Sequence, residues 1–117
     1  MALETLEPRI DVEIEDNLLD VRNSLEELRR TPRSLAAYKR VCVSVRKAKL
    51  LLLSVGRTVG GGQQESAKVL LHLAEEALQI GADAQAAIPT ESRAEFELVR
   101  IWQHRNITEL QSLTSSI

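Results

Sequence analysis

The chain has 117 residues, which suits one domain with its own core but not two. Hydrophobic residues make up 44% and charged residues 27%, which excludes wholesale disorder; aromatic residues are only 3%, which favours an aliphatic core between helices over a sheet. Charge is sorted along the chain: residues 1–28 carry 9 acids and 2 bases, residues 29–64 carry 9 bases and no acid, and residues 65–117 carry 8 acids and 4 bases.

The first predicted helix covers residues 8–30. Its apolar residues recur at spacings of three and four, continuing a pattern that begins upstream: Leu3, Leu6, Ile10, Ile14, Leu18, Val21, Leu25 and Leu28. Pro8 lacks a backbone donor, so we expect the stable helix to begin beside it. Thr31-Pro32 is expected to end this helix and to start the next one.

The second and third predicted helices cover residues 32–59 and 64–88. The second has an apolar stripe that stops before three glycines: Tyr38, Val41, Val45, Ala48, Leu52, Val55 and Val59. The third has a stripe of small residues that ends at Ile88-Pro89: Ala67, Leu70, Ala74, Ala77, Gly81, Ala84 and Ile88. The small side chains predict a close approach to a neighbouring helix.

The fourth predicted helix covers residues 91–114. Its apolar stripe is Val99, Trp102, Leu110, Leu113 and Ile117, with Asn106 at an intervening core position. Short connections make consecutive helices neighbours, so the sequence predicts a single all-α domain, residues 1–117, folded as an antiparallel up-and-down four-helix bundle. The alternative is three packed helices with the fourth leaning on a partner.

The charge blocks predict contacts between helices. An acidic first helix and a basic second helix attract each other when they are antiparallel neighbours. At about 100° per residue, one group of basic side chains lies opposite the Val45 and Leu52 stripe and leaves a basic face for a partner. This group is Lys39, Arg46, Lys47, Lys49 and Arg57. A pI near 5.7 and the lack of interleaved aromatics argue against nucleic acid, so an acidic protein surface is the expected partner.

Four consecutive leucines, Leu50–Leu53, surround the second helix, and a single core stripe cannot bury all of them. Either neighbouring helices cover both flanks, or Leu50 and Leu53 form an exposed apolar patch rimmed by bases, as in a homodimer or partner interface. Trp102 is likewise either a core residue or an interface anchor. The predicted partner-binding residues are Val43, Arg46, Lys47, Lys49, Leu50, Leu53, Arg57 and Trp102.

Residues that could support catalysis, a cofactor or a metal do not form a known motif. His72 and His104 are not preceded by glutamate at the di-iron spacing, and the lone Cys42 has no second cysteine for a zinc site. The glycines at 60–62 are not followed by the lysine of a phosphate-binding loop. We therefore expect a non-enzymatic interaction or adaptor module without cofactor or metal.

One short segment resembles a signalling motif. Ser44-Val45-Arg46-Lys47-Ala48 is similar to the His-x-x-Lys-Gly motif of histidine phosphotransfer domains, which are four-helix bundles, with serine in place of the acceptor histidine. The resemblance implies, as an alternative, a degenerate phosphotransfer-like domain that docks partners without accepting phosphate.

Cellular location is indicated by the cysteine content and the N-terminus. A single cysteine is typical of a reducing compartment. The acidic N-terminal segment lacks the basic flank and apolar run of a signal peptide, and Leu50–Leu53 is far shorter than a membrane span. These features predict a cytoplasmic protein that does not enter a membrane.

Overall fold

The computed structural model describes the backbone of residues 2–56 and 63–114 and the side chains of residues 12–54 and 64–114. These residues form four helices and no strand: α1 (Ala2–Arg30), α2 (Leu35–Gly56), α3 (Gln63–Ala84) and α4 (Arg93–Thr114). Two 3₁₀ turns, Gln85–Ala87 and Thr90–Ser92, join α3 to α4. The predicted all-α four-helix fold is confirmed.

The first helix begins six residues earlier than predicted, at Ala2, and runs through Pro8. The prediction was wrong: the three-and-four spacing of apolar residues continues upstream of the proline, and the helix follows that spacing despite the proline. The end at Arg30 agrees with the sequence. There the Thr31 backbone N–H and hydroxyl both donate to the carbonyl of Glu27, at 3.0 and 2.9 Å.

The second helix begins at Leu35 rather than at residue 32. Its N-cap is Ser34, whose Oγ accepts a hydrogen bond from the Ala37 N–H at 3.1 Å and whose carbonyl accepts one from Tyr38 N–H, also at 3.1 Å. Thr31 is occupied in closing α1, so Thr31–Ser34 becomes a turn. The predicted end of this helix at residue 59 lies outside the described residues.

The third helix ends at Ala84, four residues before its predicted end. The chain then tightens into a 3₁₀ turn, and Ile88 is extended, with φ −73° and ψ 129°, as the following Pro89 requires. The α-helical part of the fourth element accordingly begins at Arg93 rather than at residue 91.

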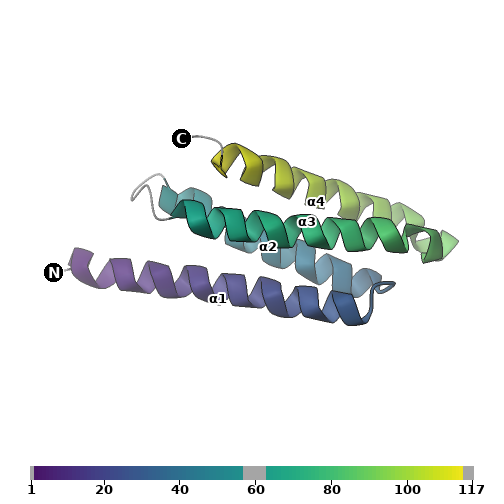
Figure 1. The fold of residues 1–117 in the computed structure, drawn as a ribbon, viewed down its shortest axis with the longest axis horizontal. Helices are drawn as coiled ribbons and strands as arrows, with labels where there is room; N and C mark the ends of the chain where they lie inside the picture. The colour runs from purple at the N-terminus through teal and green to yellow at the C-terminus, as the bar shows by residue number, and fades with distance from the viewer. Residues whose placement is uncertain (1, 57–62, 115–117) are drawn as a thin grey trace.

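The four helices run up and down in sequence, and α1 and α4 occupy opposite edges of the bundle (Figure 1). Helices α2 and α3 pack on each other and on both edge helices, whereas α1 and α4 share no packed surface among the described residues. The molecule is therefore flattened, with dimensions of 56 × 25 × 17 Å. Each central helix keeps one narrow strip open between the two edges.

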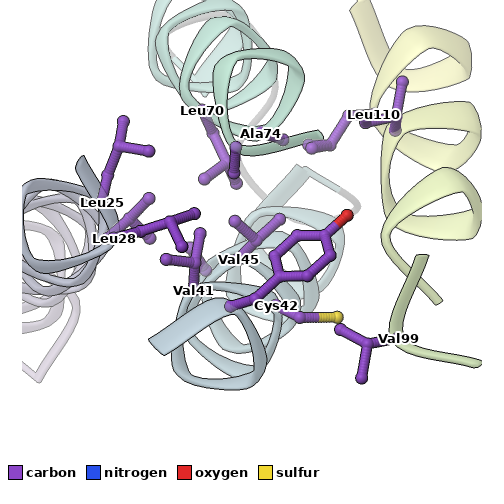
Figure 2. Packing of buried hydrophobic residues seen from close by; sticks show 14 of the residues in the cluster. Leu25, Leu28, Val41, Cys42, Val45, Leu70, Ala74, Val99 and Leu110 are labelled. Atoms are coloured by element: carbon purple, nitrogen blue, oxygen red, sulfur yellow. The ribbon is translucent and has the colours of Figure 1, made fainter. Parts of the chain in front are cut away.

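The core contains the described residues of the predicted α1, α2 and α3 stripes and part of the α4 stripe, which converge from all four helices (Figure 2). Its largest fully buried side chains include Tyr38, Phe96, Leu25, Leu28, Leu52, Leu70 and Leu110. Tyr38 and Phe96 pack ring to ring, with centroids 5.5 Å apart. Burying such aliphatic and aromatic side chains contributes roughly 1.5–3 kcal/mol each to the stability of the bundle.

Small residues let α3 approach α2 closely, as the sequence predicted. Ala74, Ala77 and Gly81 are all buried. A Cβ atom added at Gly81 would lie 2.8 Å from Cζ of Tyr38, inside van der Waals contact. The tyrosine ring therefore occupies the space that the glycine leaves.

Ion pairs between helices join the basic block to the acidic blocks on either side. Arg40 pairs with Glu27 of α1 and Arg29 with Glu76 of α3. Lys39 and Lys49 pair with Glu95 and Glu109 of α4. The predicted attraction between α1 and α2 is confirmed, and the same basic block also pairs with α3 and α4. The three exposed pairs, Arg40–Glu27, Arg29–Glu76 and Lys39–Glu95, contribute about 0.2–1 kcal/mol each, so they select neighbours more than they stabilise the fold.

No helix among the described residues combines the length and apolar character needed to cross a membrane.

Gly81→Ala should destabilise the fold by about 1–3 kcal/mol, because the added methyl group meets the Tyr38 ring. Helix propensity alone predicts the opposite, a gain of roughly 0.5–1 kcal/mol. Urea unfolding followed by circular dichroism measures the difference. A more stable Gly81→Ala variant would show that the ring moves aside at little cost.

Tyr38→Phe should be neutral or stabilising by up to about 1 kcal/mol at neutral pH, because the buried Tyr38 hydroxyl has no hydrogen-bond partner among the described residues. Burial raises the pKa of this hydroxyl far above its ordinary value of 10.0. As pH rises, the unfolded chain loses this proton before the folded chain does. The stability of the folded state is therefore unaffected by this ionisation below pH 10 and falls as pH rises above 10. The wild type should therefore lose stability faster than Tyr38→Phe above pH 10; parallel unfolding curves would contradict this.

Candidate functional site

The outer strips of the two central helices differ in character. On α3 the exposed residues are Glu65, Lys68, His72, Glu75, Gln79, Ala82 and Asp83. On α2 the strip between the edge helices carries Val43 and Leu50, each 50% exposed, with Arg46 and Lys47 between them. We call these four residues the α2 outer face. Two half-exposed apolar side chains therefore lie on an otherwise charged strip of α2.

A groove of about 430 Å³ runs beside this face, between α2 and α4. It is lined by Cys42, Val43, Arg46, Lys49 and Leu50 of α2 and by Trp102, Arg105, Asn106 and Glu109 of α4. We call it the α2–α4 groove. The buried side chains form its floor, and the exposed ones form an apolar rim with two arginines. It brings together five of the eight predicted partner-binding residues.

Trp102 belongs to the rim and not to the core. Its side chain is 44% exposed, so its predicted place in the core stripe was wrong. The buried position after Val99 is Gln103, four residues on rather than three, and the core then continues through Asn106 and Leu110. Both spacings fit a helix of 3.6 residues per turn, and hydrophobicity alone pointed to the tryptophan. The exposure of Trp102 is what its interface-anchor interpretation requires.

Lys49 is buried, with 4% of its surface exposed, which contradicts its prediction as part of an exposed basic face. Its Nζ donates to Asn106 Oδ1 at 2.9 Å and lies 3.1 Å from a carboxylate oxygen of Glu109. The position follows Val45 by four residues and precedes Leu52 by three, so the stripe spacing itself carried the signal. The grouping of Lys49 with the other bases led us to expect it on the surface instead.

The polar groups under the groove form a continuous network. Asn106 Nδ2 donates to the Cys42 carbonyl at 3.3 Å and to Gln103 Oε1 at 3.2 Å. Gln103 Nε2 in turn donates to the Ala74 carbonyl of α3 at 3.1 Å. Burial raises the pKa of the adjoining Cys42 thiol, against the opposing effect of the Lys49 and Arg46 charges. The network therefore ties α4 to α2 and α3, and Asn106 lies at the core position that the sequence predicted.

The remaining predicted partner-binding residues lie apart from the groove. Lys47 is exposed on the side facing α1, where a second hollow is lined partly by Asp20, Ser24 and Ser44. Leu53 is half-buried and Leu52 fully buried, so within the leucine run only Leu50 is exposed. Arg57 lies outside the described residues.

The electrostatics of the rim are one-sided. Arg46 and Arg105 of the rim, and Lys47 beside it on α2, form no ion pair with any described residue, whereas Lys39, Arg40 and Lys49 of α2 each form one. Glu109, the acid that lines the groove, is paired with Lys49. The rim consequently presents positive charge that the bundle does not neutralise.

The residues considered for chemistry are placed separately. Ser44 is half-buried and its Oγ lies 3.2 Å from Ser24 Oγ of α1, so the position that resembles a phospho-acceptor faces a neighbouring helix. His72 and His104 are exposed on α3 and α4. Within residues 12–54 and 64–114 no three histidine, cysteine or acidic side chains gather as a metal site would require.

Comparisons with known proteins add no relative: no protein-family model, no curated protein and no solved structure matches the chain.

Asn106→Leu should destabilise the fold by roughly 2–4 kcal/mol, because it leaves the buried Lys49 ammonium without its amide acceptor. Lys49→Met in the same background should cost less than the two single changes added together, since the stranded charge is then removed. Asn23→Leu, at an exposed asparagine of α1, should change stability by less than about 0.5 kcal/mol and serves as the control. Denaturant unfolding of the four variants tests the network; an Asn106→Leu variant as stable as the control would contradict it.

Proposed function

We propose that this chain is a helical protein-interaction module that docks an acidic amphipathic helix along the α2 outer face and the α2–α4 groove. The observation that carries the proposal is the combination of three exposed apolar residues with unpaired arginines around one hollow. Val43, Leu50 and Trp102 supply the apolar contacts, and Arg46 and Arg105 supply the charge.

The chemistry of the rim selects the kind of partner. A helix lying in a groove offers apolar residues every three or four positions, and Val43 and Leu50 are two turns apart, matching such a ligand. Exposed tryptophan and arginine are the side chains that most often contribute large parts of a binding energy. Unpaired cations beside the apolar rim favour acidic residues on the flanks of the incoming helix and raise its association rate.

The polar groups of the groove support a binding role rather than catalysis. Lys49, Asn106 and Gln103 are taken up in hydrogen bonds between helices, and burial keeps the Cys42 thiol protonated by raising its pKa. The hydrogen-bonding groups of Lys49, Asn106 and Gln103 are thus used to hold α4 in place. We therefore propose a non-enzymatic adaptor, and we place it in the cytosol on the strength of its single free cysteine.

The chain contains one tryptophan, so its fluorescence reports on the groove directly. The probe is a synthetic helical peptide without tryptophan that carries leucines two turns apart and glutamates beside them. We expect saturable binding with a blue shift of Trp102 emission, because docking removes water from a side chain that is 44% exposed. The same peptide with lysines in place of glutamates should bind at least about tenfold more weakly, because it meets Arg46 and Arg105.

A matched pair of variants locates the binding. Leu50→Glu should weaken peptide binding by about tenfold or more, since it places a like charge and a polar group in the apolar rim. Leu19→Glu, at a leucine of α1 that is 52% exposed, should bind as the wild type does. Both variants should keep wild-type helix content. Equal binding by the two variants, or no response from Trp102, would overturn the proposed docking site.

A further inference from the structure

The outer face of α1 repeats the pattern of the α2 outer face with opposite charge. On α1 it consists of Val12, Glu15, Asp16 and Leu19, which we call the α1 outer face. On α2 the corresponding residues are Val43, Arg46, Lys47 and Leu50. In both faces the leucine follows the valine by seven residues, and two charged residues follow the valine by three and four. The two faces are complementary in spacing and in sign.

Both faces are exposed and electrostatically unsatisfied. Val12 and Leu19 are 58% and 52% exposed, and Glu15 and Asp16 lie on the surface. Neither acid forms an ion pair with a described residue, although Glu27 and Glu26 further along α1 both do. The basic pair on α2 is equally unpaired, so each face lacks what the other offers.

The two faces cannot meet within one chain. The α1 core residues Ile14, Leu18 and Val21 face the bundle, and at about 100° per residue Val12 and Leu19 point the opposite way. Helix α1 packs on α2 and α3 and lies at one edge of the bundle, so its outer face is turned away from both (Figure 1). A partner for it has to come from another molecule.

We propose that the α1 outer face of one copy docks on the α2 outer face and the α2–α4 groove of a second copy. The inference rests on the proposed function, because it names the acidic amphipathic helix that occupies the groove. Glu15 and Asp16 meet Arg46 and Lys47, while Val12 and Leu19 pack against the exposed apolar residues of the α2–α4 rim. Because different patches meet, the contact is heterologous and extends copies into rings or open chains rather than closing a two-fold dimer.

The contact is weak and depends on salt. The α1 outer face contributes two apolar residues and two charges, so the contact buries far less than the roughly 800 Å² per partner of a standard stable interface. Four of the participating side chains are exposed ions, whose attraction is screened beyond about 10 Å at 0.1 M salt. Association is therefore expected at high protein concentration and low ionic strength.

Charge reversal tests the contact, with solution mass measured by light scattering across concentration at low and high salt. The wild type should exceed the 13.0 kDa of one chain as concentration rises and should return toward it in high salt. Glu15→Lys with Asp16→Lys should stay at the mass of one chain, as should Arg46→Glu with Lys47→Glu. A variant carrying all four reversals should associate again, since the faces are then complementary in the opposite sense.

Controls separate this contact from a general effect of charge. Arg30→Glu with Arg33→Glu changes the net charge as much as the α2 reversal does, at exposed arginines that form no ion pair among the described residues, and should associate like the wild type. Leu19→Glu should abolish association and keep peptide binding, whereas Leu50→Glu should abolish both.

A wild type that remains at 13.0 kDa under all conditions would overturn the inference, and so would association that persists in both double reversals. Peptide binding in dilute solution tests the groove separately. A monomeric chain that still binds the acidic peptide would refute self-docking and leave the proposed function standing.

Discussion

The constraint on which the structure depends is the packing of α2 against all three other helices. Tyr38, Val41, Val45 and Leu52 bury one side of α2 completely, and Lys49 reaches α4 through the network under the groove. Only a narrow strip of α2 is left for solvent. Because α1 and α4 lie at opposite edges and do not meet, that strip stays open along two hollows.

The buried polar network gives this arrangement its specificity. Lys49, Asn106 and Gln103 hold α4 against α2 and α3 through hydrogen bonds that a shift of α4 along its axis would break. That alignment turns Trp102 outward beside Leu50. The side chains that fix α4 therefore also determine the composition of the groove rim.

The sequence predicted much of the fold because three-and-four spacing reports directly on which side of a helix is buried: every predicted core residue of α1 and α2 whose burial is described is buried. It misplaced Trp102 and Lys49, because the hydrophobicity or charge of a residue type predicts only its average burial. Trp102 is exposed although it is apolar, and Lys49 occupies a core position because its ammonium group is hydrogen-bonded there. The start of α2 was misjudged because Thr31 and Ser34 are both good caps, and only the turn geometry decides between them. The exposure of Val43, Arg46 and Leu50 could be predicted because four consecutive leucines and a run of bases exceed what one buried stripe accommodates.

The central claim, that the outer face of α2 is a docking surface, is tested most directly by two-dimensional NMR of the isotope-labelled chain recorded over a series of concentrations. The account predicts concentration-dependent shifts at the amides of Val12–Leu19 and Val43–Leu50 and at the Trp102 indole, with α3 unaffected. Shifts confined to the polar outer strip of α3 would contradict the account. So would spectra that do not change with concentration, if adding the acidic peptide also leaves the Val43–Leu50 amides unshifted.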